Sequence, residues 1–159
     1  MKLPKIESND GTNIYYESEG GGKESIVLVS GTGFSSQVWK SFQVPYFSKK
    51  YRVLISDHRG VGFSDKPDSP YDTRMFARDI VGLLDALGIE RSHIVGHSMG
   101  GRVAQWIALD NPGRVMKLVL AATGSGNFQN KPDYIRGVPL ETALEIAEHG
   151  YAAFMRSHV

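Results

Sequence analysis

The chain has 159 residues, enough for one domain with a core, because a chain of this size buries roughly 70% of its unfolded surface on folding. Its 18 dispersed basic residues nearly balance 17 acidic ones, which argues against a nucleic-acid-binding face, and the lack of cysteine excludes disulfides and thiolate metal sites. The N-terminus lacks the apolar stretch of a signal peptide, and no run approaches the ~20 apolar residues of a membrane span. We therefore expect a cytoplasmic protein with no membrane or nucleic-acid partner.

The first half of the chain predicts short strands. Residues 3–7 and 12–18 flank Asn9-Asp10-Gly11, and an Asp-Gly pair between such runs is a strong hairpin signal. The apolar runs SIVLVS (25–30) and RVLISD (52–57) are typical of strands that are buried on both faces of a parallel sheet. Between these two strands we expect a helix over 37–49, weakened in its later part by Pro45.

The second half alternates helices and strands. The clearest helix is 72–88, which Asp72 or Thr73 can cap and Gly88 ends. Its apolar residues fall on one face: Phe76, Ile80, Leu83, Leu84 and Leu87. We expect a strand over 93–95, a helix over 99–110, a strand over 115–121 and, after a loop, a helix over 141–155. This order predicts an α/β fold with a mostly parallel sheet, entered through an antiparallel hairpin and with its sites at the carboxyl ends of the strands.

A tight turn surrounds Ser98. The run Gly96-His97-Ser98-Met99-Gly100 matches the pattern G-x-S-x-G between a predicted strand and a predicted helix. Such a reversal leaves no room for side chains two residues before and after the serine, and it exposes the serine hydroxyl at a helix N-terminus, where backbone N–H groups favour negative charge. Ser98 is therefore a candidate nucleophile. The alternatives are a chance match and a serine that only caps the helix.

A glycine-rich loop, Ser30-Gly31-Thr32-Gly33-Phe34, follows the strand 25–30. Acyl transfer needs two N–H donors for the oxyanion, and we expect one from Met99 and one from this loop. The same loop, with Asp57 at the end of the next strand, also partly matches a dinucleotide-binding fingerprint. Ser36 stands in place of the third glycine of that fingerprint, and a hairpin precedes the strand, so we expect no cofactor.

Residues 57–64, DHRGVGFS, form a second glycine-containing loop after the strand 52–57. Its glycines allow a compact turn, in which Asp57 and Arg59 have the spacing to pair locally. We expect this loop to hold its neighbours in place and to take no direct part in chemistry.

Three segments, SGTGFSSQVW, DHRGVGFSDKP and VGHSMGGRVAQWIALDNPGRVMKLVLA, together resemble the α/β-hydrolase superfamily. They are most similar to its small esterases, enol-lactone and carbon–carbon hydrolases and cofactor-free haloperoxidases. The resemblance covers roughly residues 1–124. It implies a serine hydrolase that acts on a small ester, lactone or activated ketone through an acyl-enzyme on Ser98, with the N–H groups of Thr32 and Met99 as oxyanion donors. Ser30-Gly31 replaces the His-Gly of many members, which leaves the backbone donor in place.

The family places its catalytic acid and histidine after the nucleophile, beyond an inserted helical cap. Residues 1–124 would then be the N-terminal part of the core and 125–159 the start of the cap, with the C-terminal strands missing. His97 points away from its neighbour Ser98 in such a turn, His93 begins a strand, and neither His149 nor His158 follows one. We expect the chain alone to be an incomplete catalyst. The alternative is a non-catalytic binding or assembly module that lacks the triad acid and base.

Missing C-terminal strands would also leave the strand 115–121 at an edge of the sheet. An unpaired apolar edge favours association with a second chain, so the sequence predicts a homodimer through this strand.

Overall fold

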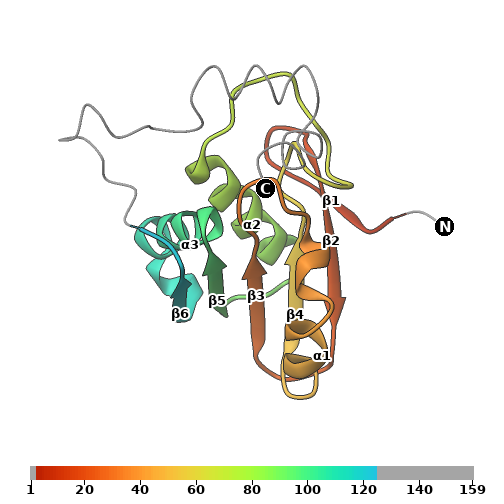
Figure 1. Ribbon diagram of the computed structural model, residues 1–159, viewed down its shortest axis with the longest axis vertical. Coiled ribbons are helices and arrows are strands. Elements are labelled where there is room, and N and C mark those ends of the chain that lie inside the picture. Colours follow the sequence, from red (N-terminus) through yellow and green to blue (C-terminus); the bar gives the residue numbers. More distant parts are fainter. Residues whose placement is uncertain (1–2, 125–159) are drawn as a thin grey trace, which may run out of the picture. The chain divides into compact units, whose positions relative to one another are not determined.

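The computed structural model describes residues 3–124 (Figure 1). The predicted helix over 141–155 and the expected cap over 125–159 lie outside the described residues. Within them the α/β fold is confirmed: one mixed sheet, helices on both of its faces and an antiparallel hairpin at its start.

The sheet has the strand order β1-β2-β4-β3-β5-β6. In chain order the strands are β1 (Lys5–Glu7), β2 (Asn13–Glu19), β3 (Ser25–Val29), β4 (Arg52–Ser56), β5 (Ser92–His97) and β6 (Val115–Ala121). Strand β2 runs antiparallel to β1 and to β4, and the pairs β3–β4, β3–β5 and β5–β6 are parallel. The carboxyl ends of the parallel strands therefore meet at one edge of the sheet, where the loops after β3, β4 and β5 lie.

The core consists of two apolar layers, one on each face of the sheet. Alternate residues of β3 divide between them, since Val27 and Val29 face helices α2 (Thr73–Ala86) and α3 (Met99–Asp110), while Ile26 and Leu28 face Trp39 and Val44. Figure 1 shows α1 (Gln43–Phe47) in front of β4. All of β3 is buried, as the unbroken apolar run predicts.

The helix expected over 37–49 is wrong. A 3₁₀ helix, η1 (Ser36–Trp39), and the short α1 take its place, separated by Phe42 with φ −135° and ψ −54°. Pro45 is the third residue of α1, where the backbone N–H has no intrahelical acceptor, so its ring is tolerated in a first turn. Pro45 thus helps to begin a second helix instead of weakening the end of one.

Helix α2 begins and ends as its sequence predicts. Asp72 is the capping residue, and its carboxylate accepts a hydrogen bond from Met75 N at 2.6 Å. Gly88, just beyond the helix, has φ +65°. A further 3₁₀ turn, η2 (Pro112–Arg114), leads into β6. Among residues 3–124, no helix is both long and apolar enough to cross a membrane.

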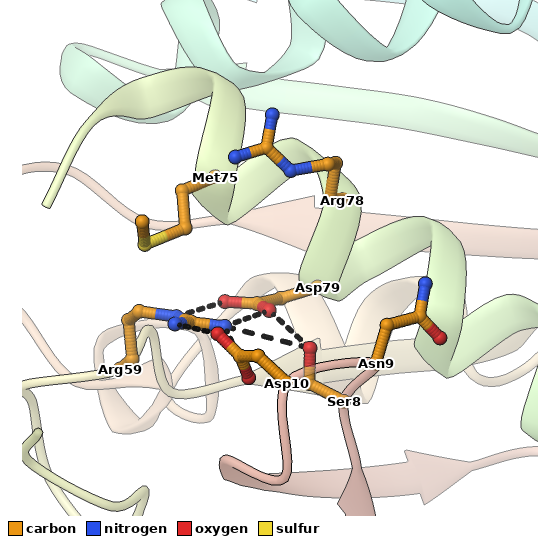
Figure 2. A pocket seen from close by; sticks show the side chains of 7 residues that line it. All are labelled: Ser8, Asn9, Asp10, Arg59, Met75, Arg78 and Asp79. Atoms are coloured by element: carbon orange, nitrogen blue, oxygen red, sulfur yellow. Dashed lines mark hydrogen bonds and ion pairs between the residues drawn. The ribbon is translucent and has the colours of Figure 1, made fainter.

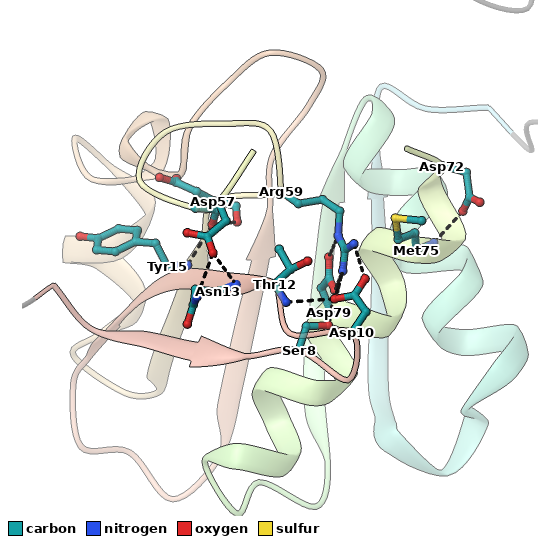
Figure 3. Close-up of polar contacts among 12 residues, drawn as sticks. Ser8, Asp10, Thr12, Asn13, Tyr15, Asp57, Arg59, Asp72, Met75 and Asp79 are labelled. Carbon is teal, nitrogen blue, oxygen red and sulfur yellow. Dashed lines mark hydrogen bonds and ion pairs between the residues drawn. The ribbon is translucent and has the colours of Figure 1, made fainter. Parts of the chain in front are cut away.

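An ionic cluster around the buried Arg59 side chain joins the β1–β2 turn to α2 (Figures 2 and 3). The Arg59 side chain is 3% exposed and donates to Asp79 at 2.8 and 2.6 Å and to Asp10 at 2.6 Å, while Ser8 Oγ donates to Asp79 at 2.7 Å. The guanidinium holds the pKa of Asp10 well below its usual range, and hydrogen bonds to Asp79 and Asp10 raise the pKa of Arg59. The predicted pairing of Arg59 with Asp57 is wrong, because all three guanidinium nitrogens donate to Asp79 or Asp10 and the Asp57 carboxylate accepts backbone N–H groups instead.

Strand β6 pairs with β5 alone in the part of the chain that the structure describes. Its apolar side chains are exposed, most of all Val119, at 51%. Association of two copies through β6 stays a prediction, since no partner chain is present.

We expect the chain to associate with rising concentration, and the change Val119→Lys to weaken association, because a lysine on an edge strand opposes pairing with another chain. Leu109→Lys is the matched control, since Leu109 is equally apolar and 71% exposed but lies on α3. Sedimentation velocity over a concentration series measures the effect. A wild-type chain that stays monomeric throughout would contradict the prediction.

Candidate active site

The backbone of Ser98 is strained. It has φ 56° and ψ −122°, a conformation that L-residues rarely adopt, and it stands between the end of β5 at His97 and the start of α3 at Met99. Ser98 N donates to Ala121 O at the end of β6 at 3.0 Å, which helps to hold this conformation. The Ser98 side chain makes no capping hydrogen bond, so capping does not account for its position.

Glycines around Ser98 are required by close approach of main chains. A Cβ on Gly96 would lie 2.3 Å from the Gly100 carbonyl oxygen, and one on Gly100 would lie 2.2 Å from Val29 O, at the end of β3. Both distances are far below van der Waals contact with backbone atoms. The strand-to-helix turn therefore has the tightness that the sequence motif predicts.

The loop after β3 lies against Ser98. A Cβ on Gly31 would be 3.2 Å from Ser98 Cβ, and the next residue, Thr32, is exposed. On the other side of Ser98, Met99 is the first residue of α3, where a backbone N–H has no intrahelical acceptor. The fold thus brings the segments that carry Thr32 and Met99 together at Ser98. Their role as oxyanion donors stays a prediction.

Both ends of this loop, residues 30–36, are anchored by buried groups. At its start Ser30 Oγ accepts from Trp39 Nε1 at 2.9 Å, and Ser30 O lies 3.2 Å from His58 Nε2. At its end Ser36 N donates to Asp57 Oδ1 at 2.7 Å. The second Asp57 oxygen accepts from Phe63 N at 2.8 Å.

The sequence predicted that the loop over 57–64 holds its neighbours in place, and these hydrogen bonds confirm it, but it did not identify Asp57 and His58 as the residues responsible. The available signal was their place directly after a buried strand, at the same sheet edge as Ser98. The two Asp57 oxygens are also unavailable to a ribose, since the residue is fully buried and both accept backbone N–H groups. The loop also leads only into the four-residue η1 and not into a long helix, so neither feature of the dinucleotide fingerprint is present here.

The described histidines contact groups other than the Ser98 hydroxyl. His58 is buried and stacks on Phe76 with ring centres 4.6 Å apart, and burial lowers the pKa of its imidazole. His93 Nε2 lies 3.1 Å from Glu24 Oε2, and exposed His97 sits edge-on to Trp39. Within residues 3–124 no hydrogen bond involves the Ser98 hydroxyl.

Comparison with known proteins agrees with this geometry. Residues 24–155 match the family model described as alpha/beta hydrolase fold. A 2-hydroxy-6-oxononadienedioate/2-hydroxy-6-oxononatrienedioate hydrolase from Paraburkholderia xenovorans (strain LB400) is 40% identical over 130 residues, which are 79% of this chain and 45% of that protein.

Solved structures are similar as well. The enol-lactonase from Burkholderia xenovorans LB400 has a TM-score of 0.83 and 30% identity, over 97% of this chain and 57% of that one. Est816, described as an N-acyl homoserine lactone degrading enzyme, has a TM-score of 0.75 and 34% identity, over 95% and 54%. The chain spans about half the length of the curated relatives it matches.

The close approach at Gly100 predicts that Gly100→Ala destabilises the fold by about 1–3 kcal/mol, because the added methyl group meets the Val29 carbonyl and one main chain must move. Gly82→Ala is the matched control. Gly82 lies in α2 with open space around its Cα, so alanine should raise the free energy of unfolding by about 0.5–1 kcal/mol. Urea denaturation measures both changes, and equal stability of the two variants would contradict the geometry.

Proposed function

Because the chain belongs to the α/β-hydrolase fold family, we propose that it is a serine hydrolase in which Ser98 Oγ attacks the carbonyl carbon of a small ester, lactone or activated ketone. The observation that carries this proposal is the backbone of Ser98, with φ 56° and ψ −122° between β5 and α3. Strain of this kind is typical of a side chain held out for chemistry. A serine at this position also argues against alkyl-enzyme chemistry, which uses a carboxylate.

For an ester, the reaction has two stages. Attack by Ser98 Oγ forms a tetrahedral intermediate, whose negative oxygen accepts hydrogen bonds from the N–H groups of Thr32 and Met99. Loss of one such donor costs about 10²–10³ in rate. The intermediate collapses, the bond between the carbonyl carbon and the alcohol oxygen breaks, and the alcohol leaves with a proton. Water then hydrolyses the acyl-enzyme and regenerates Ser98.

Ser98 needs a general base to lose its proton efficiently. None of the described histidines contacts its hydroxyl, and the family's order of triad residues places the acid and the histidine after the nucleophile. We therefore expect both to come from outside residues 3–124. His149 and His158, the two histidines that follow Ser98, lie outside the described residues.

The substrate class rests on the relatives. Their names describe a hydrolase of a 2-hydroxy-6-oxo-dienedioate, an enol-lactonase and an enzyme that degrades an N-acyl homoserine lactone. These substrates are small and carry a ketone or lactone carbonyl. Exposed Phe34, in the loop that carries Thr32, adds an apolar surface suited to the carbon skeleton of such a compound.

Labelling with a fluorophosphonate probe tests Ser98 directly. We expect slow phosphonylation on Ser98, located by mass spectrometry and absent from Ser98→Ala. Because no described histidine assists, the labelling rate should rise steadily with pH. Absence of the adduct after long exposure at pH 9 would contradict the proposal and favour a non-catalytic module. A rate that levels off near pH 6.5, the ordinary histidine pKa, would show that His149 or His158 is the base.

Turnover provides a second measurement. We expect the chain to hydrolyse p-nitrophenyl acetate no faster than its Ser98→Ala variant, because removing one triad member costs roughly 10⁴–10⁶ in rate. Serine-dependent turnover well above that control would refute the expectation that the chain alone is an incomplete catalyst, and would direct attention to His149 and His158. It would leave Ser98 as the nucleophile.

A further inference from the structure

The Asp57 carboxylate connects two loops at the sheet edge where Ser98 lies. Asp57 is fully buried at the end of β4, where one oxygen binds Ser36 N of the loop after β3 and the other binds Phe63 N of its own loop. We propose that Asp57 is a positioning residue for the hydrolase site: it sets where the Thr32 N–H stands relative to Ser98. This proposal rests on the proposed function.

The middle of the loop over 30–36 depends on its anchors. Thr32, Gly33 and Phe34 are exposed, and the one backbone hydrogen bond across them, from Phe34 N to Gly31 O, is long at 3.4 Å. The first anchor, at Ser30, continues directly from β3. The second anchor, at Ser36, is the hydrogen bond to Asp57, and the next contact with the sheet along the chain is made by Trp39 at the end of η1. If the hydrogen bond to Asp57 is lost, the first contact that holds the chain after Thr32 is Trp39, so the segment between them has more freedom to move.

Asp57 itself is held rigidly. Its backbone N donates to Tyr15 O of β2 at 3.1 Å, and its backbone O accepts from Ser64 Oγ at 2.6 Å. Gly62 passes so close that a Cβ there would lie 2.0 Å from Asp57 Oδ2. The carboxylate is therefore held in one position, and through its hydrogen bond to Ser36 N it fixes the loop after β3 relative to the end of β4. Figure 3 shows the Arg59 side chain directed toward Asp10 and Asp79 and away from Asp57.

A carboxylate is the only side chain of this size with two acceptors for two N–H donors. In Asp57→Asn the amide NH₂ must face either Ser36 N or Phe63 N, so one hydrogen bond is lost without a change of shape. Ser36→Pro removes the N–H group of residue 36, which is the donor of this hydrogen bond, and leaves Asp57 intact. Ser36 is the first residue of η1, where proline is favoured, and Ser35, with φ −73° and ψ 165°, has the conformation that precedes proline.

The matched control is Asp79→Asn. Asp79 is also a buried carboxylate, 3% exposed, but it binds the side chains of Arg59 and Ser8 and no residue of the loop 30–36. It therefore reports what the loss of a buried carboxylate does to the fold as a whole.

Two readouts on the 159-residue chain test the proposal. Amide hydrogen exchange should become faster in residues 31–36 of Asp57→Asn and in residues 31–35 of Ser36→Pro, whose proline has no amide hydrogen. The rate of fluorophosphonate labelling at Ser98 should fall about tenfold or more in both variants, since a displacement near 1 Å costs about 10²-fold. Asp79→Asn should lose stability with neither change. Each labelling rate is measured well below the melting temperature of its variant.

Labelling of both loop variants at the rate of Asp79→Asn would overturn the proposal, as would unchanged exchange in residues 31–36. If one loop variant fails to fold, the other decides. A wild-type chain with no Ser98 adduct would refute the proposed function, and hydrogen exchange would still show whether Asp57 fixes the loop.

Discussion

Close main-chain packing around Ser98 is the constraint on which the rest of the structure depends. The start of α3 touches the end of β3 at Gly100, and the end of β5 touches α3 at Gly96. No side chain fits at either contact, so the two glycines let a strand reverse into a helix within a single strained residue. The hydrogen bond from Ser98 N to Ala121 O adds β6 to the same point. Three adjacent parallel strands and one helix thus determine where one hydroxyl group stands.

The loop after β4 connects the Ser98 site to two other parts of the fold. Asp57 accepts a hydrogen bond from Ser36 N of the loop that lies against Ser98. Arg59 donates hydrogen bonds to Asp10 of the N-terminal hairpin and to Asp79 of α2. The intervening residue, His58, stacks on Phe76 of α2 and lies 3.2 Å from Ser30 O. Three consecutive residues therefore join the hairpin, the helix layer and the site. Burial makes these contacts specific, because a charge left unpaired here would be costly.

Periodicity and local motifs predicted most of the fold. The spacing of the strands, the Asp72 cap of α2 and the glycines about Ser98 depend on neighbouring residues, so the sequence shows them directly. The sequence did not indicate which residues, distant along the chain, contact one another in the fold. Arg59 binds Asp10 and Asp79, 49 and 20 residues away, and not Asp57, two residues away, because the fold brings those two carboxylates to the guanidinium while both oxygens of Asp57 accept backbone N–H groups. The break at Phe42 also depends on contacts that are distant in the sequence, since Trp39 and Val44 pack on the sheet and this packing sets where each short helix lies. The chemistry of Thr32 and Met99 rests on family resemblance and geometry together.

The Ser98 hydrogen bond to Ala121 has a consequence for the order of assembly. The strained turn follows β5, but the acceptor that holds it is the last residue of β6, 23 positions later in the chain. During synthesis from the N-terminus, the turn therefore emerges well before the strand that completes its support. The N-terminal hairpin likewise depends on a later residue, since Ser8 Oγ donates to Asp79 of α2. Both ends of the sheet are thus secured by contacts distant in sequence, which are slow to form because a long loop must close first. We expect the backbone of Ser98 to be held in its final conformation only when β6 has paired with β5.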